Sequence, residues 1–197
     1  MNFWDSRYSS EEYIYGKEPN RFFKNVIDNS APGKILLPAD GEGRNGVYAA
    51  TLGWEVHAFD SSKVAREKCF LLANDKNVSI NYVISGLEEF AYPNGEFSAV
   101  ALIHVHMPPN LRREVHAKCI NSLKPKGKFI LEAFSKGQIN FKSGGPPNID
   151  LLYDEHDIYD DLKTLQNLSV STRFIHLEEG EFHQGKAEVI RAEGEKQ

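Results

Sequence analysis

A glycine-rich turn and an acidic residue spaced behind it are the residues of this chain that are best suited to bind a cofactor. Gly41 and Gly43 stand in the segment 38–46, between an apolar run and a helix-like stretch, where the backbone must turn sharply and can approach a ligand closely. Asp60 ends the next apolar run, and a carboxylate at that place can accept two hydrogen bonds from a ribose diol. The pair predicts a cofactor that contains a nucleoside.

The glycine turn leaves two cofactor classes open. The segment 41–46, Gly-Glu-Gly-Arg-Asn-Gly, matches the dinucleotide pattern Gly-x-Gly-x-x-Gly, which indicates NAD. Three features favour an adenosyl cofactor instead. Residues 38–40 lengthen the turn, and Glu42 places an acid where a pyrophosphate would sit, although an acid there suits a zwitterionic amino acid with a sulfonium. The third feature is a hairpin at the C-terminal end of the chain. The glycines could also form a tight turn that binds no ligand. Asp60 could likewise be a simple helix cap.

Two histidines, His104 and His106, lie at the end of the most continuous apolar run of the chain, residues 97–105. Their His-x-His spacing could hold a metal ion, but no Asp, Glu or Cys stands beside them at ligand spacing. We therefore expect no metal site. Each histidine is a candidate general base if the chemistry requires that a proton be removed.

The elements that position these residues alternate along the chain. Short apolar runs, each followed by a stretch with helical spacing, predict an α/β fold with a parallel sheet covered by helices. The expected strands are 34–39, 55–60, 78–85, 97–105 and 128–134, and the expected helices include 44–52, a segment capped by Ser61 or Ser62, a segment opened by Pro108 and Pro109, and 155–165. Residues 124–127 and 143–147 are expected to be a turn and a loop.

The end of the chain differs, because two alternating segments, 171–182 and 187–192, are separated by only four residues. A connection that short requires an antiparallel hairpin. His183 would then lie in a solvated turn.

Length and charge limit the class of protein. The chain has 197 residues, 41% of them apolar, with a net charge of −5, which predicts one domain over residues 1–197 and no basic surface for nucleic acid. Its core would be 31–197, covered by an aromatic-rich extension, 1–30.

No apolar run is long enough to span a membrane and the first residues do not form a signal peptide, so we expect a cytoplasmic protein. Cys69 and Cys119 are expected to be buried and unpaired.

Several motifs resemble those of the class I S-adenosylmethionine-dependent methyltransferases, and among them the small tellurite-resistance and thiopurine methyltransferase-like group. The motifs are Trp4-Asp-x-Arg-Tyr8, Tyr13-x-Tyr-Gly-x-Glu-Pro-Asn20, Gly41-Glu-Gly-Arg-Asn45, Asp60, His106-Met-Pro-Pro109, Leu123-Lys-Pro-x-Gly127 and Gly144-Gly-Pro146. The resemblance covers nearly the whole chain. It implies a three-layer Rossmann-like fold with a seven-stranded sheet of order 3-2-1-4-5-7-6, whose strand 7 is antiparallel.

The resemblance also implies roles for single residues toward S-adenosyl-L-methionine and its product, S-adenosyl-L-homocysteine. Gly41 and Gly43 would line the methionine part, Asp60 would hold the ribose, Ser61 would lie beside the ribose or adenine, Gly86 and Leu87 would flank the adenine, and His104 would lie beside the reactive methyl group. Arg7, Tyr8 and Tyr15 would form a flap over cofactor or substrate, with Arg7 able to pair with the cofactor carboxylate. For Trp4 we expect packing against the edge of the sheet.

The chain departs from the family at Leu37 and Ala39, where an acid and a glycine are usual. Asp40 or Glu42 could replace that acid as the partner of the methionine amino group. We expect methyl transfer to a small-molecule acceptor by a monomer or weak dimer that has no nucleic-acid or membrane partner. An NAD-dependent oxidoreductase and a catalytically silent adenosyl-cofactor binder are the alternatives.

Overall fold

The computed structural model describes residues 3–197, so the first two residues of the predicted extension lie outside the described part. Seven strands form one sheet of order β3-β2-β1-β4-β5-β7-β6, which confirms the expected topology. The strands are β1 (Lys34–Pro38), β2 (Glu55–Asp60), β3 (Asn81–Ile84), β4 (Phe97–Ile103), β5 (Leu123–Phe134), β6 (Gln166–Glu179) and β7 (His183–Glu195). The first five are parallel, and β7 pairs antiparallel with both β5 and β6.

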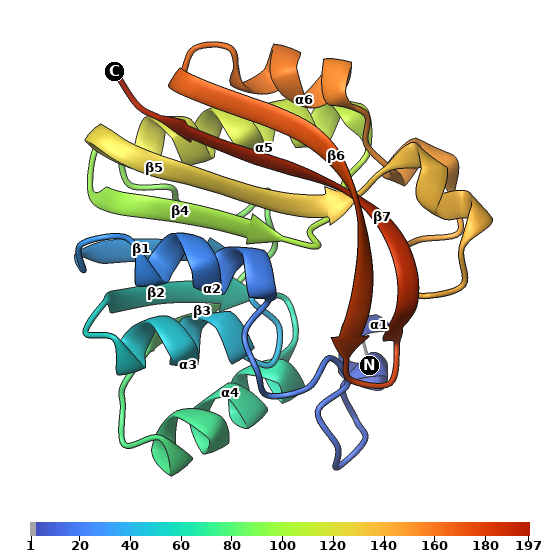
Figure 1. Cartoon of the computed structure of the whole chain (residues 1–197). Coiled ribbons are helices and arrows are strands. Elements are labelled where there is room, and N and C mark those ends of the chain that lie inside the picture. The colour runs from blue at the N-terminus through green and yellow to red at the C-terminus, as the bar shows by residue number, and fades with distance from the viewer. Residues whose placement is uncertain (1–2) are drawn as a thin grey trace.

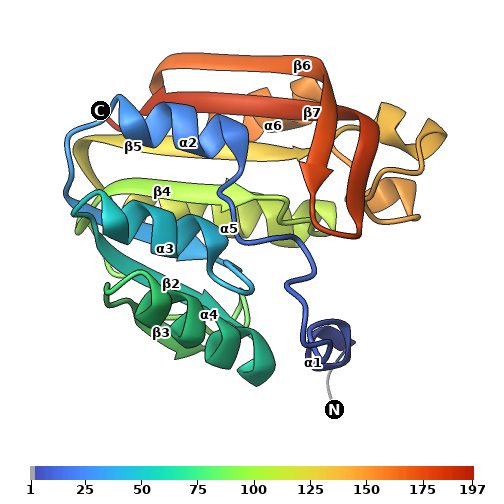
Figure 2. The ribbon, with the colours of Figure 1, turned by 60° about the horizontal axis from the view of Figure 1, so that its bottom comes forward.

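Helices cover both faces of the sheet (Figures 1 and 2). On one face, α2 (Arg21–Asp28) packs toward β5, and α3 (Arg44–Thr51) and α4 (Lys63–Asp75) pack on β2, all through one buried apolar cluster. On the other, α5 (Pro109–Ser122) packs on β4 and β5, and α6 (Glu155–Leu162) packs on β6 and β7 and beside α5. Since β1 and β4 are covered on both faces, their side chains are almost all buried, as their continuous apolar runs predict. None of the helices in residues 3–197 combines the length and the apolar character that crossing a bilayer requires.

The N-terminal extension lies across the carboxyl ends of the parallel strands. Helix α1 (Phe3–Arg7) is fixed at the start of α4, because the Asp5 carboxylate accepts a hydrogen bond of 2.7 Å from the Ser62 hydroxyl. Farther along, Asn20 caps α2 by accepting from the backbone N–H groups of Phe22 and Phe23. The two short 3₁₀ helices, η1 (Lys136–Asn140) and η2 (Ile149–Leu151), belong to the crossover after β5.

Two predicted turns are wrong. Residues 124–127 belong to β5, which begins at Leu123 with an irregular register in which Lys126 has a φ of +63°. The hairpin turn lies at 180–182 and not at the expected residues 183–186. Glu179 pairs with His183, and Gly180 supplies the left-handed conformation, with a φ of +64°.

The shifted turn also changes two expectations about single residues. His183 is the first residue of β7 and is 5% exposed, so it is not a solvated turn residue. The turn packs on the N-terminal extension, where the Glu181 N–H donates to the Ile14 carbonyl (3.1 Å). Trp4 is 41% exposed, so it does not bury against the sheet as expected; its ring stacks on Tyr8 instead.

Candidate functional site

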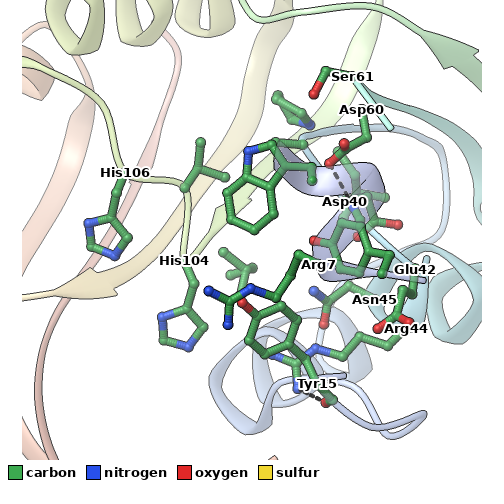
Figure 3. Close-up of a pocket in the computed structure, with 18 of the residues that line it drawn as sticks. Arg7, Tyr15, Asp40, Glu42, Arg44, Asn45, Asp60, Ser61, His104 and His106 are labelled. Atoms are coloured by element: carbon green, nitrogen blue, oxygen red, sulfur yellow. Dashed lines mark hydrogen bonds between the residues drawn. The ribbon is translucent and has the colours of Figure 1, made fainter. Parts of the chain in front are cut away.

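One cavity of about 540 Å³ opens at the carboxyl ends of β1, β2 and β4, beneath α1 and beside the β6–β7 turn. The sequence-predicted residues that line it are Arg7, Tyr8, Tyr15, Asp40, Gly41, Asp60, Ser61, Gly86, Leu87, His104 and His106. In Figure 3 the side chains of Arg7 and Tyr15 lie between the two histidines on one side and Asp40, Glu42 and Asp60 on the other. Gly43 is not among the lining residues.

The two glycines of the turn are required by contacts within the protein. Gly41 has a φ of +56°, and a Cβ there would lie 2.7 Å from the Tyr8 hydroxyl. Gly43 has a φ of +84°, and a Cβ there would lie 2.2 Å from the Cys69 sulfur of α4. Gly43 therefore permits close packing of α3 on α4, whereas Gly41 leaves room for the flap residue Tyr8 above the turn.

Asp60 ends β2 with its carboxylate inside the cavity wall. It is buried, and it accepts hydrogen bonds from the backbone N–H groups of Ser62 (2.9 Å) and Gly41 (3.2 Å). Burial raises the pKa of Asp60, while these backbone hydrogen bonds lower it. The carboxylate thus joins the glycine turn to the start of α4 and keeps one side toward the cavity, where Ser61 also lies.

The acids next to the turn play different parts. Glu42 pairs with Lys68 (2.5 Å) and accepts from the Ile14 N–H (2.8 Å), so it fastens the N-terminal extension to α4. Asp40 accepts from the Gly46 N–H (3.1 Å) through Oδ2, but its buried Oδ1 has no hydrogen-bond partner within the described residues. Burial raises the pKa of Asp40 to about 8. Unlike Glu42, Asp40 therefore makes no ion pair within the described residues, although it lines the cavity.

The departures from the family pattern are visible in the backbone. Ala39 has a φ of +52°, a left-handed conformation that glycine adopts far more easily than alanine. Leu37 is fully buried and lines the cavity as an apolar wall. The turn thus keeps the shape of a glycine turn although it carries a methyl group.

The flap side chains meet the hairpin turn across the mouth of the cavity. The Arg7 guanidinium lies over the rings of Phe182 (4.4 Å) and Phe3 (5.5 Å). Within residues 3–197, Arg7 makes no ion pair, so its charge is available to an anionic ligand group. Tyr15 lies against His183, with ring centroids 4.5 Å apart.

The two predicted histidines have different surroundings. The Nδ1 atom of His106 lies 2.8 Å from the Leu151 carbonyl, and its Nε2 accepts from the Phe134 N–H at 3.3 Å. Both nitrogens are therefore occupied in the neutral tautomer with Nδ1–H, and burial lowers the pKa of His106 to about 4. His104, at a φ of +55°, stacks on Phe134 and has no hydrogen-bond partner at either nitrogen among the described residues.

A group of buried acids lies behind His104. Glu132 of β5 is fully buried, pairs with Arg191 (2.6 Å) and accepts from the Asn20 amide (2.6 Å). Glu179 of β6 pairs with Arg44 (2.8 Å). The His104 Nε2 atom lies 3.5 Å from Glu132 Oε1 and 3.8 Å from Glu179 Oε2, too far for hydrogen bonds.

The sequence did not indicate His183, which also lines the cavity. Its Nδ1 lies 3.3 Å from Glu179 Oε2. The signal that could have found the pair is their spacing of four residues around Gly180, since a three-residue turn places the first and last of five residues opposite each other in a hairpin.

His104, Glu179 and His183 offer three ligand atoms within 4.8 Å of one another, which is the spacing of a possible metal site. The carboxylate that the His-x-His segment lacks nearby is thus supplied by Glu179 of β6, which is distant in the sequence. However, Arg44 already supplies a positive charge 2.8 Å from the Glu179 oxygen that a metal would use. The charge of Glu179 is balanced without an ion, so we assign no metal to this cluster.

Comparison with protein families gave one match for this chain. Residues 35–127, from β1 to the start of β5, match the family model described as a methyltransferase domain. A search of the curated proteins gave no match. The matched segment contains the glycine turn, Asp60 and His104, but not the N-terminal extension or the hairpin.

Solved structures share the fold of the whole chain. A structure from work on the conversion of a disulfide bond into a thioacetal group during echinomycin biosynthesis has a TM-score of 0.76 at 11% identity, covering 98% of this chain and 90% of the other. TehB from Haemophilus influenzae has a TM-score of 0.71 at 12% identity, covering 99% and 66%. A SAM-dependent methyltransferase from Methanosarcina mazei has a TM-score of 0.65 at 15% identity, covering 87% and 96%.

At these identities the solved structures show the fold, which is that of Rossmann-like methyltransferases. The family match supports a methyltransferase as the enzyme class and S-adenosylmethionine as the cofactor. Neither an NAD-dependent oxidoreductase nor a silent cofactor binder is favoured by these findings.

Proposed function

We propose that this protein transfers a methyl group from S-adenosylmethionine to a small-molecule acceptor in the cavity at the carboxyl ends of β1, β2 and β4. The observation that carries this proposal is the convergence of Asp60, the segment after β3 and His104 on one enclosed space. A parallel α/β sheet binds ligands at this edge, outside the carboxyl ends of its strands.

The residues of the cavity fit such a cofactor. The Asp40 carboxylate, which lines the cavity and makes no ion pair within the described residues, suits the methionine ammonium group, which would favour its ionised form, and Arg7 suits the methionine carboxylate. Asp60 would hold the ribose hydroxyls, and Gly86 and Leu87 would flank the adenine. Each end of the zwitterion thus has a group of opposite charge.

The bound cofactor supplies an electrophilic methyl group on a sulfonium. What the chain must contribute is alignment, because holding two reactants in the productive geometry supplies much of the rate enhancement. The acceptor would lie beside His104, between the flap residues Arg7 and Tyr15 and the loop that contains Gly144 and Gly145. Aromatic and small residues, among them Tyr15, Gly144 and Gly145, make up much of the cavity lining, which suits a small acceptor.

The finer parts of the proposal have their own support. The net charge of −5 disfavours a nucleic-acid acceptor. Membership of the tellurite-resistance and thiopurine methyltransferase-like group is supported by the N-terminal motifs and by the fold shared with TehB. Cys69 and Cys119 are buried free thiols, which fits a reducing, cytoplasmic compartment. We further propose a monomer or weak dimer.

Calorimetric titration of the protein with S-adenosylmethionine, S-adenosylhomocysteine and NAD tests the proposal. We expect binding of the two adenosyl compounds and none of NAD. In Asp60→Ala the affinity for both should fall at least tenfold, about 1.4 kcal/mol, because a charge-assisted contact to the ribose is lost. Asp75→Ala, which removes an exposed acid from the end of α4, is the control and should bind normally. Unchanged affinity in Asp60→Ala, or binding of NAD alone, would contradict the proposal.

A further inference from the structure

We propose that His183, oriented by Glu179, is the base that removes the proton from the methyl acceptor, and that the acceptor is a flat, apolar molecule with a hydroxyl nucleophile. The inference rests on the proposed function and names its substrate class. The observation behind it is a carboxylate–histidine pair at the wall of the cavity that faces the hairpin turn.

The pair fixes which nitrogen of His183 can accept a proton. An ionised carboxylate only accepts hydrogen bonds, so Nδ1, at 3.3 Å from Glu179 Oε2, must carry the hydrogen. The lone pair then resides on Nε2, on the other side of the ring. Glu179 itself is held by Arg44 (2.8 Å) and by the Asn20 amide (3.2 Å), so the carboxylate cannot turn away. This is the arrangement in which a carboxylate orients a histidine base.

The charged groups around His183 keep it in the form that a base needs. Burial would raise the pKa of Glu179, but the hydrogen bond from His183 and the charge of Arg44 outweigh it and hold that pKa well below its usual range. Burial lowers the pKa of His183, an effect that Glu179 opposes and Arg44 reinforces. The imidazole is therefore neutral at pH 7. The other titratable rings in contact with it are His104 and Tyr15, and burial keeps His104 uncharged as well.

The walls around His183 indicate the shape of the acceptor. Its ring lies 4.5 Å from that of Tyr15 and 5.3 Å from that of Phe134, measured between centroids, and Phe182 precedes it in the chain. The rings of Tyr15 and Phe134 thus contact the proposed base, and Phe182, with the Arg7 guanidinium over it, lines the same cavity. A flat, apolar body would pack on these rings, as aromatic pairs do.

The other histidines are less suited to this task. Both nitrogens of His106 are used within the protein, by Leu151 and Phe134. His104 Nε2 lies 3.5 Å from Glu132 and 3.8 Å from Glu179 and forms a hydrogen bond with neither, so no carboxylate hydrogen bond fixes its tautomer. Only His183, among the histidines that line this cavity, combines a carboxylate partner with a nitrogen left for the acceptor.

A base of this kind selects the nucleophile. A thiol, with a pKa of about 8.5, is partly ionised at neutral to mildly alkaline pH, and a neutral amine can attack with its own lone pair. A phenolic hydroxyl, with a pKa of about 10, therefore gains most from proton removal. The proton passes from the hydroxyl to His183 Nε2 and later to solvent. The freed oxygen pair forms the bond to the methyl carbon while the carbon–sulfur bond breaks, and the pair of that bond stays on the sulfur, which becomes a neutral thioether.

The first test needs no acceptor. We would record the imidazole nitrogen resonances of ¹⁵N-labelled protein by NMR at pH 7, with and without S-adenosylhomocysteine, and assign His183 by its absence in His183→Gln. We expect a neutral ring with Nδ1–H and a bare Nε2, and loss of this tautomer preference in Glu179→Gln. A ring protonated on Nε2, or an imidazolium at pH 7, would overturn the assignment of the base.

The second test measures methyl transfer from labelled S-adenosylmethionine to phenol, 4-nitrothiophenol and aniline at pH 8. In His183→Gln we expect the rate with phenol to fall at least a hundredfold and the rate with 4-nitrothiophenol, which is already ionised, to change less than threefold. Affinity for S-adenosylhomocysteine should be unchanged. The matched control is His156→Gln, since His156 also faces an acid four residues away, Asp160, but is 85% exposed at its side chain.

The outcomes separate the inference from the function on which it rests. Equal rates with phenol in the wild type and in His183→Gln would overturn the inference and leave methyl transfer intact. Transfer to the thiol or the amine but not to phenol would overturn the hydroxyl class. Loss of activity on treatment with a chelator, with recovery on adding Zn²⁺, would show that the cluster of His104, Glu179 and His183 holds a metal instead. No transfer by the wild type to any of the three probes would overturn the proposed function.

Discussion

Single residues at the ends of β1 and β4 adopt backbone conformations that are costly for them. Ala39 and His104 both have a positive φ, +52° and +55°, and both line the cavity. Strained backbone of this kind persists where the surrounding structure determines it, often at functional sites. The sequence identified both positions, Ala39 as a departure from a family glycine and His104 as a strand-end histidine, but the backbone angle itself follows from the packing around the turn.

Replacing Ala39 by Gly should therefore stabilise the protein. A left-handed conformation costs an L-residue about 1 to 2 kcal/mol, and part of that gain is offset by the larger entropy of glycine in the unfolded chain. We expect the free energy of unfolding to rise by about 1 kcal/mol and Tm by about 2 to 4 °C. Calorimetry of the wild type and of Ala39→Gly measures this difference. A lower Tm would mean that packing of the Ala39 methyl group outweighs the strain.

Elements that meet at the cavity come from distant parts of the sequence. Strand ends and the helices that follow them could be predicted, because apolar periodicity and the glycine turn are local signals. The partnership between the N-terminal extension and the β6–β7 turn could not, because it depends on Glu181 meeting Ile14 and on the place of a three-residue turn. Moving that turn by three residues hid His183 from the sequence-based prediction.

One buried lysine holds the extension in place. Lys68 of α4 pairs with Glu42 and donates hydrogen bonds to the backbone carbonyls of Ser10 (2.9 Å) and Glu12 (2.6 Å). Both charged side chains of the pair are at most 10% exposed. These contacts hold the segment that follows the flap residues Arg7 and Tyr8 against α4.

We expect Lys68→Met to destabilise the fold by about 3 kcal/mol, because removing one partner leaves the Glu42 carboxylate buried without its counter-charge. Hydrogen exchange of residues 8–14 should become faster, while the amides of β1 and β4 stay protected. Urea unfolding and hydrogen exchange measure the two effects. Lys76→Met, at the exposed end of the same helix, should change neither. Normal protection of residues 8–14 in Lys68→Met would contradict the role assigned to this lysine.

At the scale of the whole molecule, some parts of the site could be predicted from the sequence and others could not. The sheet order agrees with the prediction, and eleven of the twelve residues predicted for the site line one cavity, because the strand ends of a parallel sheet meet at one edge. The buried charges behind that edge, Glu132 with Arg191 and Glu179 with Arg44, could not be predicted. Each joins strands or helices more than fifty residues apart, so only the folded arrangement shows that these charges compensate each other.

Buried titratable groups should make the stability of the whole molecule depend on pH. Burial lowers the pKa of His104 well below 6.5 and that of His106 to about 4. Below pH 6.5 the unfolded chain therefore binds two protons that the folded protein does not bind. Stability then falls as the pH falls. Burial also raises the pKa of Asp40 to about 8, so the folded protein keeps one proton that the unfolded chain has released, which opposes the effect. The unfolded chain therefore binds about one proton more than the folded protein, counting these three groups.

Other buried groups act in both directions: His116, His183 and Glu179 add to the effect, while Asp60 and Glu132 oppose it. One net proton corresponds to about 1.4 kcal/mol per pH unit, so we expect the free energy of unfolding to fall by about 2 kcal/mol between pH 6 and pH 4.5. Urea titrations at several pH values measure the slope. His156→Gln, which removes an exposed histidine, should leave it unchanged. Stability that is constant or rises on acidification would mean that the buried carboxyl groups bind protons more strongly than the buried histidines exclude them.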